Sequence, residues 1–563
     1  MLPPALLHGL GQLQRTPRAF SFARALRDPM RAQRESLGAA LAQGRDTAYG
    51  REHGLGEATD PASFARRVPV LVPDDLAPWV ARQMQGESRV LSEEDPIYFV
   101  RTTGSTGTPK HVPITRAYVG DFQKTVHVAL WHLHRRFPRA FLGRALYFVG
   151  SRRVDETPSG VGIGTMSGFN FTELPPVVRA VYAWPYELFE VGDLDTRTWL
   201  ALHLASIRDV SLVAGIFPAP VVYLLRELER RGDELAHHVA RGTLPSWLRL
   251  DDAQRRFFEA ATPPRPDLEK ALVAASRAPV EEKVRLALPK LRLVYCWTTA
   301  SAALYVPELR RRVGDQVTIR DAIYSACESW ASIPMGDEEP GGPLAIQSGY
   351  YELVDETRVD AVGDPRNLAP EDFRTIADVE DGRRYYLVPT TTGGLYRYWL
   401  GDVVEVRGFE GRTPRIVFVR KGGAATNLAG EKLDEAHVNA AVGGALTELG
   451  LDATWFCMTP DPTPGSVPGY VLHVELREST SLPTSLGERV DARLRSGSFD
   501  YDRVRGSRQL VDVRVVTLPP GSYAAHRQAR VASGNAEAQL KIAHLADRLP
   551  DDLAARASGI APD

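Results

Sequence analysis

Short apolar runs alternate with longer amphipathic stretches through most of the chain. The runs at residues 145–149, 291–295, 317–320 and 385–388 are rich in β-branched, aromatic and leucine residues, and they predict short, largely buried strands. Residues 196–208 and 220–238 have the apolar spacing of amphipathic helices. Strands that alternate with helices predict a large α/β domain with helices on the faces of its sheet.

The pattern changes after the apolar run at residues 415–419. A glycine-rich stretch at 421–425 leads into a helical signal at 431–448, followed by two alternating runs at 453–458 and 470–477. A helix near 486–495, a strand at 511–518 and a helical tail complete the chain. We therefore predict a large N-terminal domain over residues 1–420 and a smaller α+β C-terminal domain over residues 421–563, joined at a glycine-rich hinge.

Composition narrows the class of protein. Of the 563 residues, 44% are hydrophobic and 25% charged, which is typical of a globular protein, and the net charge of −2 gives no general reason to bind nucleic acid or an anionic membrane. Three widely separated cysteines exclude a disulfide framework and a zinc cluster. No apolar run is long enough to span a bilayer, and the first residues do not read as a signal peptide. We expect a cytoplasmic protein.

The strongest local signal is a Gly/Ser/Thr-rich stretch with apolar alternation on either side, which predicts two strands joined by a loop. Glycines let backbone N–H groups converge on an anion, while hydroxyls and a lysine add donors and charge. Pro109 precedes the lysine and a strand-like run follows it, so the stretch is not a Walker A loop. It predicts another kind of phosphate loop, with a plain polar hairpin turn as the alternative. The candidate residues are Thr102, Thr103, Gly104, Ser105, Thr106, Gly107 and Lys110.

This loop resembles the ATP loop of the adenylate-forming (ANL) superfamily. More narrowly, the chain resembles the Gretchen Hagen 3 (auxin-responsive promoter) acyl acid–amido synthetases. The supporting stretches are residues 49–54, 64–70, 394–402 and 429–433, so the resemblance extends over essentially the whole chain. It implies an adenylate-forming ligase that uses ATP and Mg²⁺.

The resemblance assigns roles to a segment that follows a predicted strand. Residues 323–329 are similar to the superfamily's Tyr-x-x-Thr-Glu segment, which implies that Tyr324 packs on adenine and Glu328 coordinates magnesium. A planar ring suits a base, and a carboxylate with substrate phosphates is the usual way to hold Mg²⁺. Cys327 stands where the family commonly has Thr or Ser, and a thiol is a weaker donor to phosphate.

Other nucleotide contacts are implied in the same way. Residues 394–402 resemble the Tyr-Arg-x-Gly-Asp motif, so Asp402 would hold the ribose hydroxyls. Thr299 and Ala300 match the loop that flanks adenine, and Arg420 matches the hinge cation near the nucleotide.

Lys541 is the candidate adenylation lysine. The segment ending at this residue resembles the family's C-terminal Gln-x-Lys segment, although the usual Pro-Arg does not follow. The chain has only eight lysines among its 68 basic residues, and beyond Lys432 this is the only one. A compact, flexible ammonium can reach single oxygens that a forked guanidinium fits less well. The alternative is an exposed helix lysine.

The implied reaction activates a carboxylic acid as an acyl-adenylate, with release of pyrophosphate, and transfers the acyl group to an amino acid or other small amine. Lys110 and Lys541 would be catalytic, and neither nucleic acid nor a membrane is expected as a partner. An acyl-CoA ligase would share every nucleotide motif and differ only in using a thiol acceptor. A kinase would release ADP rather than AMP, and a non-catalytic binding protein would leave the joint spacing of the motifs unexplained.

Overall fold

The computed structural model describes residues 3–102, 110–215, 217–422, 426, 428, 431, 433–461, 467–478, 483–506, 510–532, 543–546 and 548–557. The chain divides into two compact units, residues 1–418 and residues 419–563. None of the helices in the described part of the chain is both long and apolar enough to cross a membrane.

Unit 1 begins with helices. They are α1 (Pro4–Ala25), α2 (Pro29–Gly44), α3 (Ala48–Glu52), α4 (Pro61–Arg67) and α5 (Pro73–Met84). Prolines occupy the first turns of α1, α2, α4 and α5, where the missing N–H costs no helical hydrogen bond. The aliphatic and aromatic side chains of this region share one core with the strands at residues 98–114 and with the antiparallel sheet over residues 342–421.

The first sheet carries the predicted phosphate loop. β1 (Tyr98–Thr102) and β2 (Lys110–Ile114) pair antiparallel, with Thr102 opposite Lys110, which confirms the prediction of two strands joined by a loop. β5 (Gly162–Gly164) pairs parallel with β1, and β4 (Asp155–Glu156) completes the order β2-β1-β5-β4. α6 (Arg116–Arg136) follows β2 and packs along α1.

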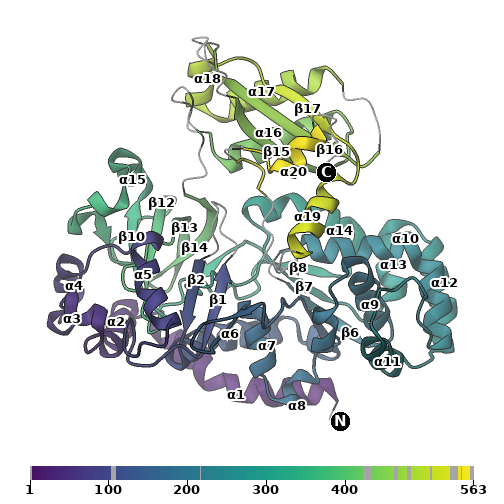
Figure 1. Ribbon diagram of the computed structural model, residues 1–563, viewed down its shortest axis with the longest axis horizontal. Coiled ribbons are helices and arrows are strands. Elements are labelled where there is room, and N and C mark those ends of the chain that lie inside the picture. Colours follow the sequence, from purple (N-terminus) through teal and green to yellow (C-terminus); the bar gives the residue numbers. More distant parts are fainter. Residues whose placement is uncertain are drawn as a thin grey trace. The chain divides into compact units, whose positions relative to one another are not determined.

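A parallel sheet confirms the predicted α/β architecture. Its order is β3 (Arg144–Tyr147), β6 (Val210–Ala214), β7 (Leu293–Tyr295) and β8 (Thr318–Arg320). Figure 1 shows these strands beside the teal helices that pack with them in a second core. Those helices are α9 (Leu194–Ser206), α10 (Ala219–Arg241), α11 (Asp252–Ala261), α12 (Glu269–Arg277), α13 (Val280–Ala287) and α14 (Val306–Val313).

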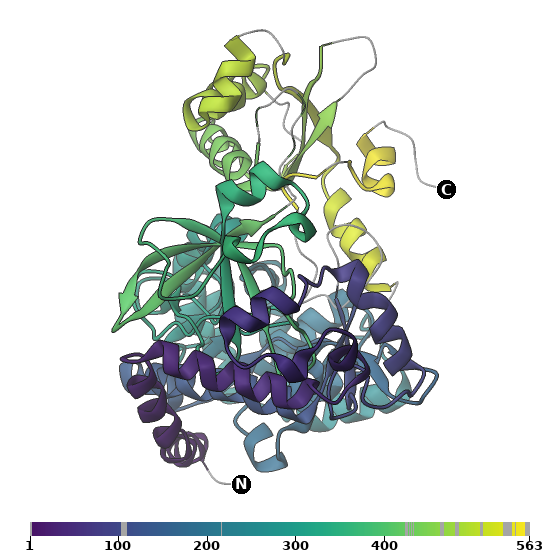
Figure 2. The same cartoon turned by 90° about the vertical axis from the view of Figure 1, so that its left-hand side faces the viewer.

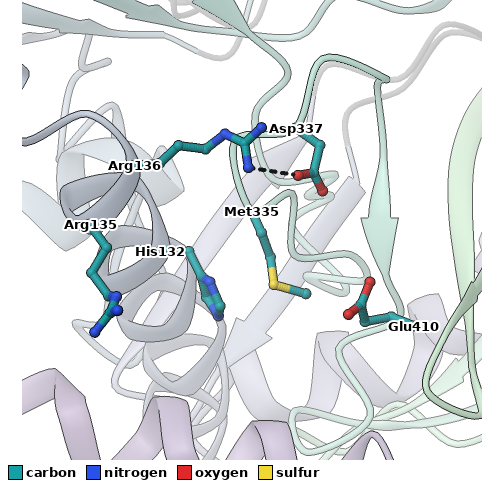
Figure 3. A pocket seen from close by; sticks show the side chains of 6 residues that line it. All are labelled: His132, Arg135, Arg136, Met335, Asp337 and Glu410. Atoms are coloured by element: carbon teal, nitrogen blue, oxygen red, sulfur yellow. Dashed lines mark ion pairs between the residues drawn. The ribbon is translucent and has the colours of Figure 1, made fainter.

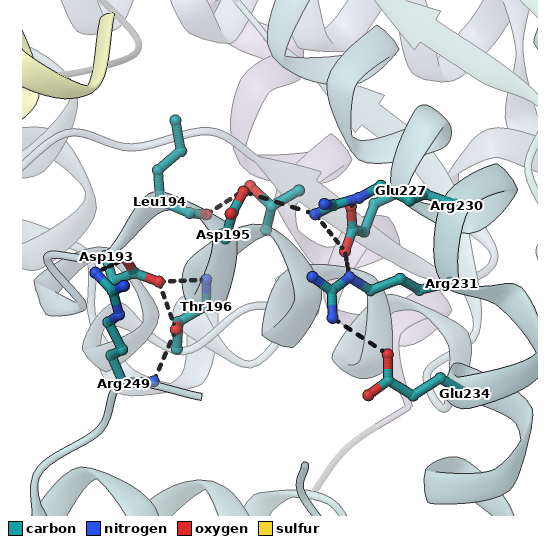
Figure 4. Close-up of polar contacts among 10 residues, drawn as sticks. Asp193, Leu194, Asp195, Thr196, Glu227, Arg230, Arg231, Glu234 and Arg249 are labelled. Atoms are coloured by element: carbon teal, nitrogen blue, oxygen red, sulfur yellow. Dashed lines mark hydrogen bonds and ion pairs between the residues drawn. The ribbon is translucent and has the colours of Figure 1, made fainter. Parts of the chain in front are cut away.

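A polar network joins α9 and α10 at the edge of this core (Figure 4). Asp193 caps α9 by accepting from the Thr196 backbone N–H at 2.9 Å. Within α10, Arg231 departs from helical geometry, with φ at −132°, and its guanidinium bridges Glu227 at 3.1 Å and Glu234 at 3.3 Å. These ion pairs span the irregular turn of the helix, so the network has a structural role.

The third sheet of unit 1 was not predicted from the sequence. Its order is β11 (Phe373–Arg374), β10 (Tyr350–Asp355), β12 (Arg384–Thr390), β13 (Asp402–Glu410), β14 (Thr413–Lys421) and β9 (Gly342–Pro343). β10 pairs antiparallel with β11 and β12, and β12 does so with β13. Figure 2 shows these strands in green above the purple N-terminal helices of unit 1, and α2 contacts β10.

Unit 2 has the predicted α+β order of elements. A three-stranded sheet is formed by β15 (Ala453–Asp461), β16 (Gly469–Leu476) and β17 (Arg514–Leu518). α16 (Glu435–Glu448) packs against α17 (Ser485–Gly497). The remaining helices are α18 (Phe499–Gly506), α19 (Ser522–Ala532) and α20 (Asp551–Ala557).

Candidate functional site

The candidate site starts where the parallel strands β7 and β8 end. Asp321 follows β8 and accepts hydrogen bonds from the Thr298 backbone N–H at 2.8 Å and from the Thr298 hydroxyl at 3.0 Å. Burial raises the pKa of Asp321, although these hydrogen bonds oppose that rise. The contact holds the loop after β7 against the loop after β8. In the first loop, Thr299 precedes a short 3₁₀ helix, and Ala300 has a φ of +50° in the left-handed region.

A tight turn after β8 carries the proposed adenine and metal residues. The Tyr324 carbonyl accepts from the Ala331 N–H at 2.9 Å, which closes the turn around Cys327 and Glu328. The Tyr118 hydroxyl on α6 donates to the Cys327 carbonyl at 2.9 Å. α6, which follows the second strand of the phosphate-loop hairpin, therefore contacts the turn.

Tyr324 and Asp402 are in direct contact. The Tyr324 hydroxyl donates to Oδ2 of Asp402 at 2.6 Å, and Asp402, the first residue of β13, is 5% exposed. The Tyr324 ring lies 5.3 Å from the ring of Phe418 at a tilt of 30°. Burial, with the neighbouring Asp402 carboxylate, raises the pKa of Tyr324 well above its ordinary value. The phenol is therefore a neutral donor at physiological pH.

Tyr398 is a site residue that the sequence reasoning missed. Burial, together with the nearby Glu328 and Asp402 carboxylates, raises the pKa of the Tyr398 phenol well above its ordinary value. Tyr324, Glu328, Tyr398 and Asp402 thus form one cluster of two carboxylates and two neutral tyrosines. The available signal was its position within the stretch 394–402, four residues before Asp402.

Arg397, next to Tyr398, has a structural role instead. Its Nε lies 2.9 Å from Oε2 of Glu352 in an ion pair whose side chains are each 3% exposed. Its NH1 donates to the carbonyls of Ala65 at 2.9 Å and Val68 at 2.7 Å. The Arg397 guanidinium therefore links Ala65 and Val68 of the N-terminal segment to Glu352 of β10.

Two more of the stretches that carry the family resemblance meet at the same place. Tyr396 stacks on Tyr49 with ring centroids 5.4 Å apart, and its hydroxyl donates to the Leu91 carbonyl at 2.8 Å. The Leu71 N–H donates to the Arg397 carbonyl at 3.0 Å. Residues 49–54, 64–70 and 394–402 therefore belong to one buried scaffold under the cluster.

The structure does not bring all of the predicted site residues together. Thr102 and Lys110 face each other at the loop end of the β1–β2 hairpin. Arg420 belongs to unit 2, where its Nε lies 3.6 Å from Asp434. Six predicted residues lie outside the described residues: Thr103, Gly104, Ser105, Thr106, Gly107 and Lys541.

The carboxylate chemistry fits a magnesium ion that is held partly by its substrate. Among the described residues, no group of three or more His, Cys, Asp or Glu side chains forms a ready-made metal cage. Mg²⁺ usually binds through one or two carboxylates plus substrate phosphates, so one oriented carboxylate is a suitable protein contribution. Glu328, with the Tyr398 phenol nearby, supplies such a group.

A separate hollow of about 350 Å³ opens on the surface of unit 1 (Figure 3). Arg136 pairs with Asp337 across it at 3.2 Å, and Met335 lies between them and Glu410. Side chains of both charge signs line this hollow, and none of the cluster residues Tyr324, Glu328, Tyr398 and Asp402 is among them. The hollow therefore does not extend the candidate site. Its lining residues are His132, Arg135, Arg136, Met335, Asp337 and Glu410.

Three family models match the chain in sequence order. The GH3 family N-terminal domain matches residues 18–318, the central domain residues 342–421 and the C-terminal domain residues 436–549. The chain belongs to the GH3 family. The central-domain match coincides with the antiparallel sheet that holds Arg397, Tyr398 and Asp402.

GH3 relatives from plants share about a quarter of the aligned residues with this chain. A probable indole-3-acetic acid-amido synthetase GH3.2 of Oryza sativa subsp. japonica is 27% identical over 471 residues, covering 80% of this chain and 76% of the relative. The jasmonoyl–L-amino acid synthetase JAR4 of Nicotiana attenuata is 25% identical over 434 residues, covering 74% of each.

Solved structures agree on the fold. A GH3.15 acyl acid amido synthetase superposes with a TM-score of 0.82 at 20% identity, covering 96% of both chains. A 2-hydroxyisobutyryl-CoA ligase reaches a TM-score of 0.51 at 13% identity, covering 92% of this chain and 89% of the ligase. The GH3 chain therefore has the fold of adenylate-forming ligases.

Proposed function

We propose that this GH3 chain is an ATP-dependent acyl acid–amido synthetase. It would activate a carboxylic acid as an acyl-adenylate, release pyrophosphate, and pass the acyl group to an amino acid or other small amine with release of AMP. The observation that carries the proposal is the cluster of Tyr324, Glu328, Tyr398 and Asp402 at the ends of the parallel strands. Ligands of open α/β sheets bind outside the carboxyl ends of the strands, which supports a nucleotide at this edge.

The nucleotide roles follow from the chemistry of each group. The Tyr324 ring offers a flat face to adenine, with Thr299 and Ala300 in the loop beside it. Asp402, already oriented by the Tyr324 hydroxyl, accepts hydrogen bonds from the ribose diol. The hairpin loop after Thr102, with Lys110 at its far end, cradles the phosphates through backbone N–H groups, hydroxyls and one ammonium. Cys327 and Arg420 complete the proposed nucleotide contacts.

Glu328 is the proposed protein ligand for Mg²⁺. A bound magnesium ion would neutralise phosphate charge, which lowers the cost of bringing a carboxylate to the α-phosphate. The chain's own contribution would be the Glu328 carboxylate itself, with the neutral Tyr398 phenol close to it.

The C-terminal domain supplies the proposed adenylation lysine. The carboxylate and ATP both carry negative charge, so a mobile ammonium at Lys541 would help to align them during the first step. Its withdrawal would then admit the amine, which requires the small domain to move about the hinge near Arg420. Domain boundaries, hinge and cytoplasmic location stay predictions.

The proposal is tested with the full-length protein by acid-dependent ATP–pyrophosphate exchange over a panel of carboxylic acids. We expect exchange with at least one acid, and its loss in Asp402→Ala and Glu328→Gln. An absence of exchange with all acids, or exchange that both variants retain, would contradict the proposal. Formation of ADP rather than AMP would instead indicate a kinase.

A further inference from the structure

One face of α1 is apolar and open to solvent. The helix buries His8, Ala19 and Phe22 on the opposite side, where it packs along α6. At about 100° per residue, the four outward side chains fall within an arc of about 80°. They are Leu6, Leu10, Leu13 and Phe20, which are 49%, 51%, 72% and 62% exposed.

Another exposed apolar side chain lies in the hairpin that contacts the end of this helix. The N–H of Arg412, in the turn between β13 and β14, donates to the carbonyl of Leu26 at 2.9 Å, so this hairpin packs on the end of α1. Phe409 lies in the same hairpin and is 43% exposed. Of ten large exposed apolar side chains in the described part of the chain, five therefore lie on α1 or in this hairpin, which is more clustering than scattered surface residues show.

Charge on this face is predominantly positive. Residues 4–25 contain no acidic residue, although the net charge of the whole chain is −2; of their three arginines, Arg24 is exposed, whereas Arg15 is partly buried and Arg18 contacts His127 of α6. Arg24, Arg27 and Arg412 are exposed and form no ion pair with another described residue. The neighbouring acids are already engaged: Asp28 accepts from the Arg31 N–H at 3.3 Å, and Glu410 lies 3.6 Å from Arg415.

We propose that this surface, the α1 face, docks on anionic lipid bilayers. It is defined by Leu6, Leu10, Leu13, Phe20, Phe409, Arg24, Arg27 and Arg412. Leucine and phenylalanine side chains along one line of a helix can enter the boundary between headgroups and acyl chains, while arginines meet lipid phosphates. Trp131, whose ring centroid lies 6.0 Å from that of Phe20, adds an aromatic ring suited to the same depth.

A second copy of the chain is a poorer occupant. Each copy could bury about 330 Å² of surface along the stripe, because a 22-residue helix is about 33 Å long and about 10 Å wide. A stable dimer interface buries about 800 Å² per partner. Pairing two such faces would also bring arginines together without carboxylates of their own to offset them. A bilayer can contact the whole length of the apolar stripe, and its negative charge is opposite to that of the arginines beside the stripe.

The experiment is co-sedimentation of the full-length protein with phosphatidylcholine vesicles, with and without phosphatidylserine. We expect binding only when phosphatidylserine is present, weakened by added salt. Leu10→Gln combined with Leu13→Gln should reduce the bound fraction about tenfold or more, as should Arg24→Gln combined with Arg27→Gln. Because these side chains are exposed, circular dichroism and the melting temperature should match the wild type.

A matched pair of variants isolates the surface. Phe20→Ser should lose binding, whereas Phe257→Ser, at an exposed phenylalanine on α11, should bind as the wild type does. Wild-type protein that stays in the supernatant, or binding that the α1 variants do not change, would overturn the proposal. So would light scattering that shows a vesicle-free dimer abolished by the leucine substitutions. The result is independent of acyl-adenylate formation.

Discussion

The Tyr324 hydroxyl lies 2.6 Å from Oδ2 of Asp402, so the turn after β8 and the first residue of β13 hold each other in place. Tyr324 follows the parallel sheet and Asp402 begins a strand of the antiparallel sheet, and the two residues are 78 positions apart. In the proposed function they contact the base and the ribose of one nucleotide. A single hydrogen bond therefore orients both ends of the proposed nucleoside contact before ATP arrives.

Removing this hydroxyl gives the first prediction. Tyr324→Phe keeps the ring but deprives a buried carboxylate of a donor, so the KM for ATP should rise about tenfold, with a smaller change in kcat. Exchange kinetics at varied ATP measure it. Tyr385→Phe is the control, because that hydroxyl accepts from the Glu380 backbone instead. An unchanged KM in Tyr324→Phe would mean that the contact with Asp402 does not shape the nucleotide site.

Glu328 gives a prediction about magnesium. Glu328→Gln should lower the adenylation rate by about 10²-fold or more and raise the Mg²⁺ concentration needed for half-maximal exchange. Tyr398→Phe should shift the Mg²⁺ requirement in the same direction by a smaller factor, since it removes only a hydroxyl close to the carboxylate. Titrations of exchange against Mg²⁺ measure both. Wild-type Mg²⁺ curves in both variants would remove Glu328 from the metal site.

The fold could be predicted where the signal is local. The strands now numbered β1, β2, β7, β8 and β12, and the order of elements in unit 2, follow from apolar runs and loop composition. The antiparallel sheet was missed because its strands pair across intervening turns and helices. β9 and β14, for example, pair although they are separated by about seventy residues, and no periodicity within either strand encodes that choice.

The site, like the fold, could be predicted from the sequence only in part. Family resemblance selected Tyr324, Glu328 and Asp402, and the structure brings them together with Tyr398. The contact between Tyr398 and Glu328 could not be read from the sequence, because only the fold brings residues 70 positions apart into contact. Arg397 is the opposite case, a residue of the family motif that has a structural role. As a charge next to Tyr398 it resembles a ligand residue, yet its partners are Glu352 and two backbone carbonyls.

Stability should depend strongly on the buried ion pair of Arg397 and Glu352. Arg397→Met leaves a carboxylate buried without its partner, which should cost about 3 kcal/mol or more. Arg397→Met with Glu352→Leu should recover part of that loss, because no charge stays buried. Thermal melting of the three proteins measures the difference. A double variant less stable than Arg397→Met would show that the pair is not the main contribution of Arg397.

Buried histidines predict lower stability in acid. Burial lowers the pKa of His203 to about 3 and that of His544 to about 4, from an unfolded value of 6.5. The folded state therefore binds fewer protons, so stability is complete above pH 6.5 and falls toward pH 4. Each buried histidine contributes a slope of about 1.4 kcal/mol per pH unit in that window.

His203 allows a direct check of this slope. Neither of its ring nitrogens has a hydrogen-bond partner among the described residues, so an apolar side chain can replace the ring without losing a bond. His203→Leu should flatten the fall in melting temperature between pH 7 and pH 5, whereas the same change at the exposed His237 should not. Curves of melting temperature against pH that run parallel for the wild type, His203→Leu and His237→Leu would contradict the prediction.

Lys541 separates the two half-reactions. Lys541→Ala should abolish ATP–pyrophosphate exchange but leave the reaction of a supplied acyl-adenylate with the amine largely intact, since the ammonium acts only in the first step. Lys432→Ala, at the other lysine beyond residue 421, is the matched control. If both half-reactions survive, or both fall equally, Lys541 is not the adenylation lysine.

The central claim is that this GH3 chain joins an acyl group to an amine. The most direct test supplies an acid that supports exchange, MgATP, a mixture of amino acids and coenzyme A together, and identifies the products by mass spectrometry. The account predicts AMP and an N-acyl amino acid in equal amounts. A thioester as the sole acyl product would contradict it and assign the chain to the acyl-CoA ligases.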